Sequence, residues 1–420
     1  MTTEILTLTS FAYGGEAFGR LADGRACFVP YALPGETVRI ALVEEKRNFG
    51  RGHLLEIITA APERIESRCR HHFRPGMAEP ACGGCHYQMM PYERQLQAKT
   101  EILRDQLQRI GRLENPNIRP AVGSPELWNY RNHIQFHQDA EGKLGYIDAT
   151  ASGILPIHEC HLPEPVLNDL WPQLELDPIP GLARVSLRAG AGEDVMLILE
   201  SDDPEPVELE LDLPLSVVHQ GPGGNLVLAG DDRLVIEVNG RDFYVSSAAF
   251  FQVNTALAGE MVRHLLANLD ISPGSTVIDA YCGVGLFSAF LAEKSGRLVG
   301  IESSESACED FALNLDEFDN VELYEAPVEQ VLPQLEIHPD LIVVDPPRAG
   351  LERAVLDAIL RLAPPRLAYI SCDPATLGRD ARRLDAGGYR LEQVTPFDLF
   401  PQTYHIESIS FWVRGAGDRG

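Results

Sequence analysis

The stretch "VIDAYCGVGLF" at residues 277–287 indicates how the C-terminal part of the chain folds. It has the composition of a buried strand, followed by a turn with Gly283 and Gly285 and then by the start of a helix. Strand-like and helix-like runs alternate throughout residues 246–420, which is typical of βαβ units. We therefore expect an α/β domain of Rossmann-like type there, with a parallel sheet covered by helices on both faces.

Acidic residues at the expected strand ends indicate a ligand that contains a nucleoside. Asp279 ends the first strand, and Glu302 ends the next one in "RLVGIE", where a carboxylate can bind two ribose hydroxyls. The run "DLIVVDPPRAG" ends in Asp345, which the two following prolines keep out of a helical conformation. Because the GxGxxG pattern of dinucleotide enzymes is absent, the turn favours S-adenosylmethionine over NAD.

The rest of the chain is expected to form two further domains. Residues 1–62 contain short strand-like runs separated by Gly-Gly, Asp-Gly and Pro-Gly turns, which predicts an OB-like β-barrel of the RNA-binding kind. A purely structural β-module is the alternative for that segment. Residues 63–245 are expected to form a central β-rich domain, whose helix at 90–111 is amphipathic and able to pack on the C-terminal domain.

Composition and charge limit the partners of the protein. The 420-residue chain has eight cysteines, no apolar run of 18 residues and no leader-like start, so we expect a cytoplasmic protein without a membrane contact. Nothing implies a protein partner, and we expect a monomer. The net charge of −27 argues against a polyanionic partner, but residues 1–133 carry a balance of +2 and the remainder −29. RNA contacts are therefore expected mainly on the N-terminal third, and the acidic run at 200–213 is expected to be a solvated surface.

The cysteine in "SCDPATL" at residues 371–377 is a candidate nucleophile. The preceding run "PRLAYI" predicts a strand, so Cys372 should emerge at the same sheet edge as Asp345, beside a helix start that lowers the pKa of a thiol. A thiolate beside a methyl donor can add to carbon 6 of uracil, which makes carbon 5 nucleophilic. A base must then remove the proton from carbon 5. Glu407 in "YHIESISFW" is the available carboxylate, and His405 is a second candidate.

Together these motifs resemble the RNA uracil-5-methyltransferases, which form 5-methyluridine. The resemblance rests on "AFFQVN", "DAYCGVGLF", "DPPRAG", "SCDPATLGRD" and "YHIES", and on "GGEAFGR" and "FVPYALPGETV", which look like a TRAM domain. It implies a class I methyltransferase domain in which Cys372 is the nucleophile and Glu407 is the base. It also implies S-adenosylmethionine ligands at Gln252, Tyr281, Glu302 and Asp345, and RNA contacts at Arg131, Asn132 and Phe250.

The chain departs from the family pattern at two places near the expected S-adenosylmethionine site. Leu286 stands after the glycine turn, where a polar residue is often found. The segment after the third strand reads Ala326-Pro327, where some members contact adenine. Contacts at this second place are therefore expected to come from the backbone or to be missing.

Four cysteines form a candidate cofactor site. Cys82 and Cys85 form a C-x-x-C pair, Cys69 precedes them with 12 intervening residues, and Cys160 follows far downstream. Four thiolates can hold zinc or an iron–sulfur cluster, and the residues alone leave that choice open; four unrelated cysteines are a third reading. The resemblance favours a [4Fe–4S] cluster, although its members usually have a shorter first spacer. Zinc remains the alternative because histidines lie in the same segments, at positions His71, His72, His86, His158 and His161.

We therefore predict an enzyme that transfers a methyl group from S-adenosylmethionine to carbon 5 of a specific uridine in RNA. The expected substrate is 23S rRNA, and tRNA is the alternative. One rival is a methyltransferase for a protein or a small molecule, in which the Cys372–Glu407 pair would have no function. The other rival is a non-catalytic RNA-binding protein, against which the intact Cys372, Glu407 and Asp345 argue.

Overall fold

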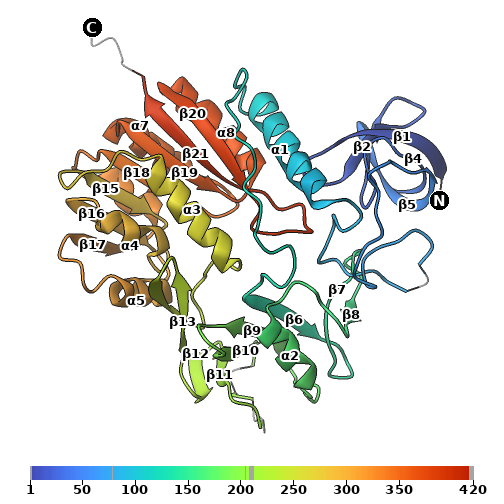
Figure 1. Ribbon diagram of the computed structural model, residues 1–420, viewed down its shortest axis with the longest axis horizontal. Coiled ribbons are helices and arrows are strands. Elements are labelled where there is room, and N and C mark those ends of the chain that lie inside the picture. The colour runs from blue at the N-terminus through green and yellow to red at the C-terminus, as the bar shows by residue number, and fades with distance from the viewer. Residues whose placement is uncertain (1, 78, 204, 208–211, 416–420) are drawn as a thin grey trace.

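The computed structural model describes residues 2–77, 79–203, 205–207 and 212–415, which form three lobes (Figure 1). The N-terminal barrel lies at one end, the C-terminal sheet at the other, and the central sheet lies below both in this view. Helix α1 (Tyr92–Arg109) runs between the barrel and the C-terminal sheet. Side chains on this helix can therefore contact both terminal domains.

Five strands at the N-terminus form a closed barrel in the order β1-β2-β3-β5-β4. Buried and exposed residues alternate on the first strand, where Leu6 and Leu8 enter the barrel core and Thr7 faces outward. This alternation agrees with the strand pattern in the sequence and confirms the expected small β-barrel. The strands are β1 (Thr3–Phe11), β2 (Ala17–Arg20), β3 (Ala26–Val29), β4 (Thr37–Glu45) and β5 (Phe49–Thr59).

The central region is built on a seven-stranded sheet in the order β12-β11-β10-β9-β6-β7-β8. Its pairs are antiparallel except for β10 and β11, which run parallel. One short helix covers a face of the sheet, where Leu167 and Leu170 pack with Phe136 and Val185. The elements are β6 (His133–Gln138), β7 (Leu144–Ile147), β8 (Ile154–Pro156), α2 (Pro165–Leu170), η1 (Trp171–Gln173), β9 (Leu182–Ala189), β10 (Val195–Ser201), β11 (Ser216–Gly221) and β12 (Gly224–Ala229).

The C-terminal domain contains a second seven-stranded sheet, in the order β17-β16-β15-β18-β19-β21-β20. Strands β15 to β19 are parallel, whereas β21 runs antiparallel to both β19 and β20. The elements, with the hairpin that precedes them, are β13 (Arg233–Val238), β14 (Arg241–Ser246), α3 (Thr255–Ala267), β15 (Thr276–Ala280), α4 (Leu286–Ala292), β16 (Arg297–Glu302), α5 (Glu305–Asn314), β17 (Val321–Glu325), α6 (Val328–Val331), η2 (Leu332–Gln334), β18 (Leu341–Val344), α7 (Arg353–Leu362), β19 (Arg366–Ser371), α8 (Pro374–Ala386), β20 (Tyr389–Phe397) and β21 (Glu407–Arg414).

Two hydrophobic cores lie on the two faces of the C-terminal sheet. On β18, Leu341 and Val343 pack with residues of α3, α4 and α5, whereas Ile342 and Val344 pack with residues of α1, α7 and α8. Successive side chains of a strand point to opposite faces, so a strand that is covered on both sides is apolar throughout. The expected parallel sheet with helices on both faces is confirmed.

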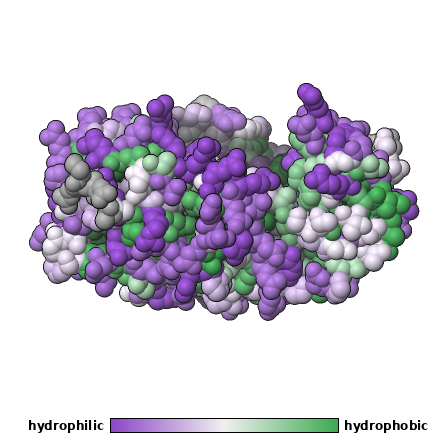
Figure 2. All heavy atoms as spheres, turned by 90° about the horizontal axis from the view of Figure 1, so that it is seen from above, coloured by the Kyte–Doolittle hydropathy of each residue, from purple (hydrophilic) through white to green (hydrophobic). Residues whose placement is uncertain are grey.

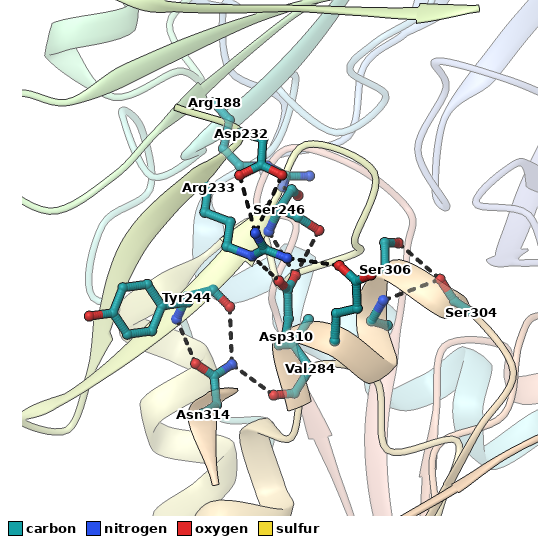
Figure 3. Close-up of polar contacts among 12 residues, drawn as sticks. Arg188, Asp232, Arg233, Tyr244, Ser246, Val284, Ser304, Ser306, Asp310 and Asn314 are labelled. Carbon is teal, nitrogen blue, oxygen red and sulfur yellow. Dashed lines mark hydrogen bonds and ion pairs between the residues drawn. The ribbon is translucent and has the colours of Figure 1, made fainter. Parts of the chain in front are cut away.

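The β13–β14 hairpin joins the central sheet to the C-terminal domain (Figure 3). The buried carboxylate of Asp310 on α5 accepts hydrogen bonds from Arg233 Nε at 2.9 Å and from the Ser246 amide at 2.7 Å. From the central sheet, Arg188 donates to the Ser246 carbonyl at 2.8 Å. The expected boundary between residues 245 and 246 stays a prediction, and this packing favours counting the hairpin with the C-terminal domain.

The surface is mixed in character. Figure 2 shows a mostly hydrophilic face with hydrophobic patches on the lobe where the barrel lies. Exposed apolar side chains of the barrel are Ile5, Val43, Leu55 and Ile58. The acidic run at 200–213 lies partly outside the described residues. In the described parts of the chain, no helix has both the length and the apolar character needed to cross a membrane.

Candidate active site

The topology of the C-terminal sheet brings most of the expected site residues to one edge. Tyr281, Asp345 and Cys372 directly follow the parallel strands β15, β18 and β19, and Glu302 is the last residue of β16. Because β21 runs antiparallel, its first residue, Glu407, lies at this same edge. The pairs Ser371–Ser408 and Phe397–Glu407 fix that register. The order of the sheet reverses between β15 and β18, which is where open α/β sheets bind ligands.

The backbone around the glycine turn already holds the Glu302 carboxylate in place. One oxygen accepts a hydrogen bond from the Gly283 amide at 3.0 Å, and the other accepts from the amides of Ser303 and Ser304 at 2.7 and 2.8 Å. Gly285 has a φ of 91°, and a Cβ atom there would lie 2.4 Å from Leu315. The turn therefore requires glycine at this position and presents a fixed carboxylate toward the switch point of the sheet.

The buried carboxyl group of Asp279 and the half-buried one of Asp345 make the strand edge suited to a cationic ligand. The low solvation of its carboxyl group and the neighbouring charge of Asp279 together raise the pKa of Asp345 to about 8. Burial also raises the pKa of Asp279 to about 7. A hydrogen bond of 2.6 Å from Ser288 favours the charged form of Asp279 and partly opposes this effect. A ligand with an amino group and a sulfonium, such as S-adenosylmethionine, would stabilise the ionised form of these groups.

The two departures from the family pattern lie near this edge. Leu286 is the first residue of α4 and is buried, so it contributes to the core. The Ala326 amide donates to the Glu302 carbonyl at 2.8 Å, and Pro327 precedes α6. The segment after β17 thus lies beside Glu302, and any contact with a base there would come from its backbone.

The environment of Cys372 differs from the one expected from the sequence. Cys372 precedes α8, but the Asp373 carboxylate already accepts hydrogen bonds from the amides of Ala375 and Thr376, at 2.9 and 2.8 Å. Burial and the nearby carboxylates of Glu407 and Asp345 raise the pKa of the thiol to about 12, while Arg348 opposes them. The expected lowering of the thiol pKa by the helix end is therefore wrong for the ligand-free protein, because burial, and after it the carboxylates of neighbouring strands, disfavours the thiolate.

Of the two candidate bases, Glu407 lies at the strand edge next to Cys372, whereas His405 lies in the loop before β21. Glu407 is only 9% exposed, and burial followed by the charge of Asp345 raises its pKa well above the usual range. His405 lies before β21 rather than on it, and its Nδ1 is 2.7 Å from an Arg348 guanidinium nitrogen. Burial and that positive charge lower the pKa of His405 to about 3. The imidazole is therefore neutral, and its Nδ1 already accepts a hydrogen bond from Arg348.

Gln252 and the expected RNA residues lie on a neighbouring segment. The Gln252 carbonyl accepts a hydrogen bond of 3.0 Å from the side-chain amide of Asn132, which also donates to Thr255 Oγ1 at 2.9 Å. Asn132 is 3% exposed, so an RNA contact there stays a prediction and the geometry favours a supporting role for it. Phe250 is 72% exposed, and together with Arg131 it lines a cavity in the central region.

The same cavity of about 590 Å³ is lined by all four cysteines of the candidate cofactor site. Burial raises the pKa of each thiol, to about 11 for Cys82, and neighbouring thiols add to the effect at Cys82 and Cys85. Within the described residues, however, no three His, Cys, Asp or Glu side chains are gathered closely enough to hold a metal ion. The structure brings the predicted ligands to one cavity but does not show a formed metal site.

Three residues of the site region were not predicted from the sequence. Arg348 of the "DPPR" motif lies beside His405, and its charge acts on Cys372. Lys99 on α1 is 1% exposed and pairs with Asp398. From the barrel, the Tyr13 hydroxyl donates a hydrogen bond to the Asp373 carboxylate, next to Cys372.

Comparisons with known proteins agree with this geometry. The family model for tRNA (uracil-5-)-methyltransferases matches residues 209–414, and the TRAM domain model matches residues 3–55. A protein of Gloeobacter violaceus named as an uncharacterized RNA methyltransferase is 34% identical, covering 97% of this chain and 96% of its own. One of Streptomyces avermitilis with the same description is also 34% identical, covering 95% of each chain. The solved Pyrococcus abyssi tRNA (uracil-54, C5)-methyltransferase with S-adenosyl-L-homocysteine is 24% identical, with a TM-score of 0.72 over 97% of this chain and 100% of that one, and it shows the same fold.

The fold and the strand-edge site thus define a class I methyltransferase domain joined to a TRAM barrel. The chain belongs to the RNA (uracil-5-)-methyltransferase family of S-adenosylmethionine-dependent enzymes. The resemblance found in the sequence motifs is thereby confirmed.

Proposed function

We propose that the protein methylates carbon 5 of a specific uridine in RNA through a covalent bond between Cys372 and carbon 6 of the base. The observation that carries this proposal is the register of β19 and β21, which places Cys372 and Glu407 at adjacent strand ends. A nucleophile and a carboxylate at neighbouring strand ends are what the addition and elimination steps require. Neither rival reading of the sequence gives this pair a function.

The proposed reaction has two stages. The Cys372 thiolate adds to carbon 6 of uracil, and the resulting enolate carbon attacks the methyl group of S-adenosylmethionine, which releases S-adenosylhomocysteine. Glu407 then takes the proton from carbon 5, and the electrons of that bond re-form the double bond as the Cys372 sulfur leaves. Because the thiol has a pKa of about 12 in the ligand-free protein, we expect the positive sulfonium and Arg348 to favour its ionisation in the complex.

Four residues are proposed to bind S-adenosylmethionine. Glu302 is held by three backbone amides at the end of β16 and suits the ribose hydroxyls. Asp345 suits the positive end of the ligand, because its half-buried carboxyl lies next to Asp279 at the strand edge. Tyr281 follows β15 with a φ of 65°, and the Gln252 segment is held by Asn132.

The RNA is proposed to approach across the central cavity and the barrel. Phe250 offers an exposed aromatic face, and Arg131 lines the cavity beside it; a ring and a guanidinium can stack a base and hold a phosphate. We propose 23S rRNA as the first substrate to test, with tRNA as the alternative. The relatives are named only as RNA methyltransferases, whereas the family model and the Pyrococcus abyssi structure are named for tRNA, so both RNAs belong in the test.

We further propose that the four cavity cysteines hold a [4Fe–4S] cluster, with zinc as the alternative. What supports this is the donor set, because four soft sulfur ligands surround one cavity and burial disfavours their thiolates without a cation. Such a group would stabilise the loops that carry Cys69, Cys82, Cys85 and Cys160. The proposed methyl transfer needs no electron from it.

A covalent-trapping gel tests the proposed reaction. The protein, purified without air, is mixed with S-adenosylmethionine and 5-fluorouridine-substituted transcripts of 23S rRNA and of tRNA. Fluorine does not leave as a proton, so the enzyme should remain attached to its substrate as a denaturation-resistant adduct. The adduct should be lost in Cys372→Ala and retained in Cys27→Ala, which removes a buried thiol of the barrel core. Binding of S-adenosylmethionine without an adduct on either RNA would contradict the proposal and favour another class of substrate.

A further inference from the structure

The position of Glu407 depends on the loop of residues 398–406. This loop connects β20 to β21, and the pair Phe397–Glu407 closes it. Asp398 therefore follows directly after the residue that pairs with Glu407. Whatever holds this loop also sets where the carboxylate of Glu407 lies relative to Cys372.

Helix α1 ties down the loop through two buried polar residues. Gln95 donates to Gln402 Oε1 at 3.0 Å and accepts from the Gln402 amide, also at 3.0 Å. Lys99 lies one helical turn further along, where its Nζ contacts the Asp398 carboxylate and donates to the Phe400 carbonyl at 3.1 Å. The two residues occupy the same face of α1 and contact successive parts of the loop.

Stability alone is a weak reason for a lysine at this position. Lys99 and Asp398 are each 1% exposed, and lysine is very rarely buried so completely. A buried ion pair is often no more stabilising than apolar side chains of similar volume, because both charges lose their hydration. An aliphatic residue on the apolar face of α1 would therefore stabilise the protein equally well at this position. The charge of Lys99 is better explained by a second charged group that it faces.

The charge that Lys99 faces, besides Asp398, is Glu407. Burial raises the pKa of Glu407 and lowers that of Lys99, and each charge opposes this effect on the other, because Lys99 favours the charged form of Glu407 and Glu407 that of Lys99. The other charged groups that act on Glu407 are Asp345 and Asp373, which raise its pKa, and Arg348, which lowers it. Arg348 is exposed and screened by water, whereas the field of the buried Lys99 is screened much less.

We propose that Lys99 is a positioning residue for the base: it fixes the loop before Glu407 and places a buried positive charge next to that loop, which favours the carboxylate form needed for proton removal from carbon 5. This inference rests on the proposed function, because it assigns a partner to the base of that reaction. It adds a residue of the central region to a site otherwise built from the ends of the C-terminal strands.

Two matched variants separate the charge of Lys99 from its hold on the loop. Lys99→Met removes the charge, whereas Gln95→Leu removes a loop contact and leaves every charge in place. The readout is tritium release from transcripts made with [5-³H]uridine, measured as kcat and KM between pH 5.5 and 9. Without the charge, Glu407 ionises at higher pH, so the acid limb of kcat in Lys99→Met should move up by about one pH unit. On the acid side of that limb kcat should be about tenfold lower, whereas on the plateau kcat and KM should be nearly unchanged. In Gln95→Leu kcat should fall while the limb stays in place.

A double variant protects the test against a folding failure. Lys99→Gln combined with Asp398→Asn keeps a neutral hydrogen-bonded pair, and exchanging both partners avoids a lone buried charge. It should show an upward shift of the acid limb that is smaller than in Lys99→Met, because the negative charge of Asp398 is removed together with Lys99, and S-adenosylmethionine affinity serves as the measure of folding. An unshifted limb in folded Lys99→Met or in the double variant overturns the proposal. If wild-type protein releases no tritium from either RNA, the proposed function itself fails, whereas wild-type release with unshifted variants removes only the role of Lys99.

Discussion

Two groups of predicted residues end in very different arrangements. The strand-edge site consists of Tyr281, Glu302, Asp345, Cys372 and Glu407, and the cysteine cavity contains Cys69, Cys82, Cys85 and Cys160. In the first group, strand register fixes each residue, and the parallel order brings them together. In the second group the cysteines lie outside the named helices and strands, and the described part of the chain does not gather them into a metal-binding group. Backbone pairing thus preorganises the strand-edge site, whereas the loops that carry the cysteines do not bring them into a fixed arrangement.

The two regions nevertheless meet at the loop of residues 398–406. The amides of His86 and Tyr87, directly after Cys85, donate to the Gln402 carbonyl at 2.8 and 3.0 Å. The imidazole of His86 also packs against Tyr404, with ring centroids 4.6 Å apart. The segment that carries the C-x-x-C pair therefore supports the same loop that positions Glu407.

The largest effect is expected from Glu407→Gln, which leaves the strand-edge geometry intact but removes the base. Turnover should fall by about 10³-fold or more, because general-base catalysis contributes on that order. Addition by Cys372 does not need this base, so natural uridine transcripts should accumulate as a covalent adduct with the protein on a denaturing gel. His405→Gln, at the neighbouring position, should retain release of the product. Normal turnover in Glu407→Gln would show that Glu407 is not the base, although the pairing of β19 and β21 places it next to Cys372.

An intermediate effect is expected from Cys85→Ser, which removes one of the four thiols that line the cysteine cavity. If the four thiols bind a cluster or zinc, this variant should lose bound metal, and its unfolding midpoint should fall by about 5 °C. Methylation should fall by about tenfold through the contact of His86 and Tyr87 with Gln402, while S-adenosylmethionine affinity stays unchanged. Iron, sulfide and zinc analysis of anaerobically purified protein measures the first effect. Equal metal content in Cys85→Ser and wild type would contradict the cluster proposal.

The sequence predicted the strand-edge site because its information is local. Each candidate follows an apolar run, and the alternation of strands and helices implies that those runs end at one edge. The raised pKa of Cys372 was not predicted, because the helix end was considered without the burial of the thiol and without the carboxylates of neighbouring strands. Lys99 could have been noticed as a charged residue on the apolar face of α1, but its partner Asp398 comes from a distant part of the chain. The docking of the barrel through Tyr13 has no local signal at all.

The smallest effect is expected from Tyr13→Phe, which tests whether the barrel is coupled to the strand-edge site. The Tyr13 hydroxyl donates to one oxygen of Asp373, while the other oxygen holds the amides that begin α8 after Cys372. Loss of this one hydrogen bond is expected to remove about 1 kcal/mol, or about fivefold in kcat/KM for RNA, with S-adenosylmethionine affinity unchanged. Tyr244→Phe, which alters an exposed tyrosine of the β13–β14 hairpin, is the matched control and should leave both quantities unchanged. Equal kinetics in Tyr13→Phe and Tyr244→Phe would mean that the barrel contributes to RNA binding without helping to position Cys372.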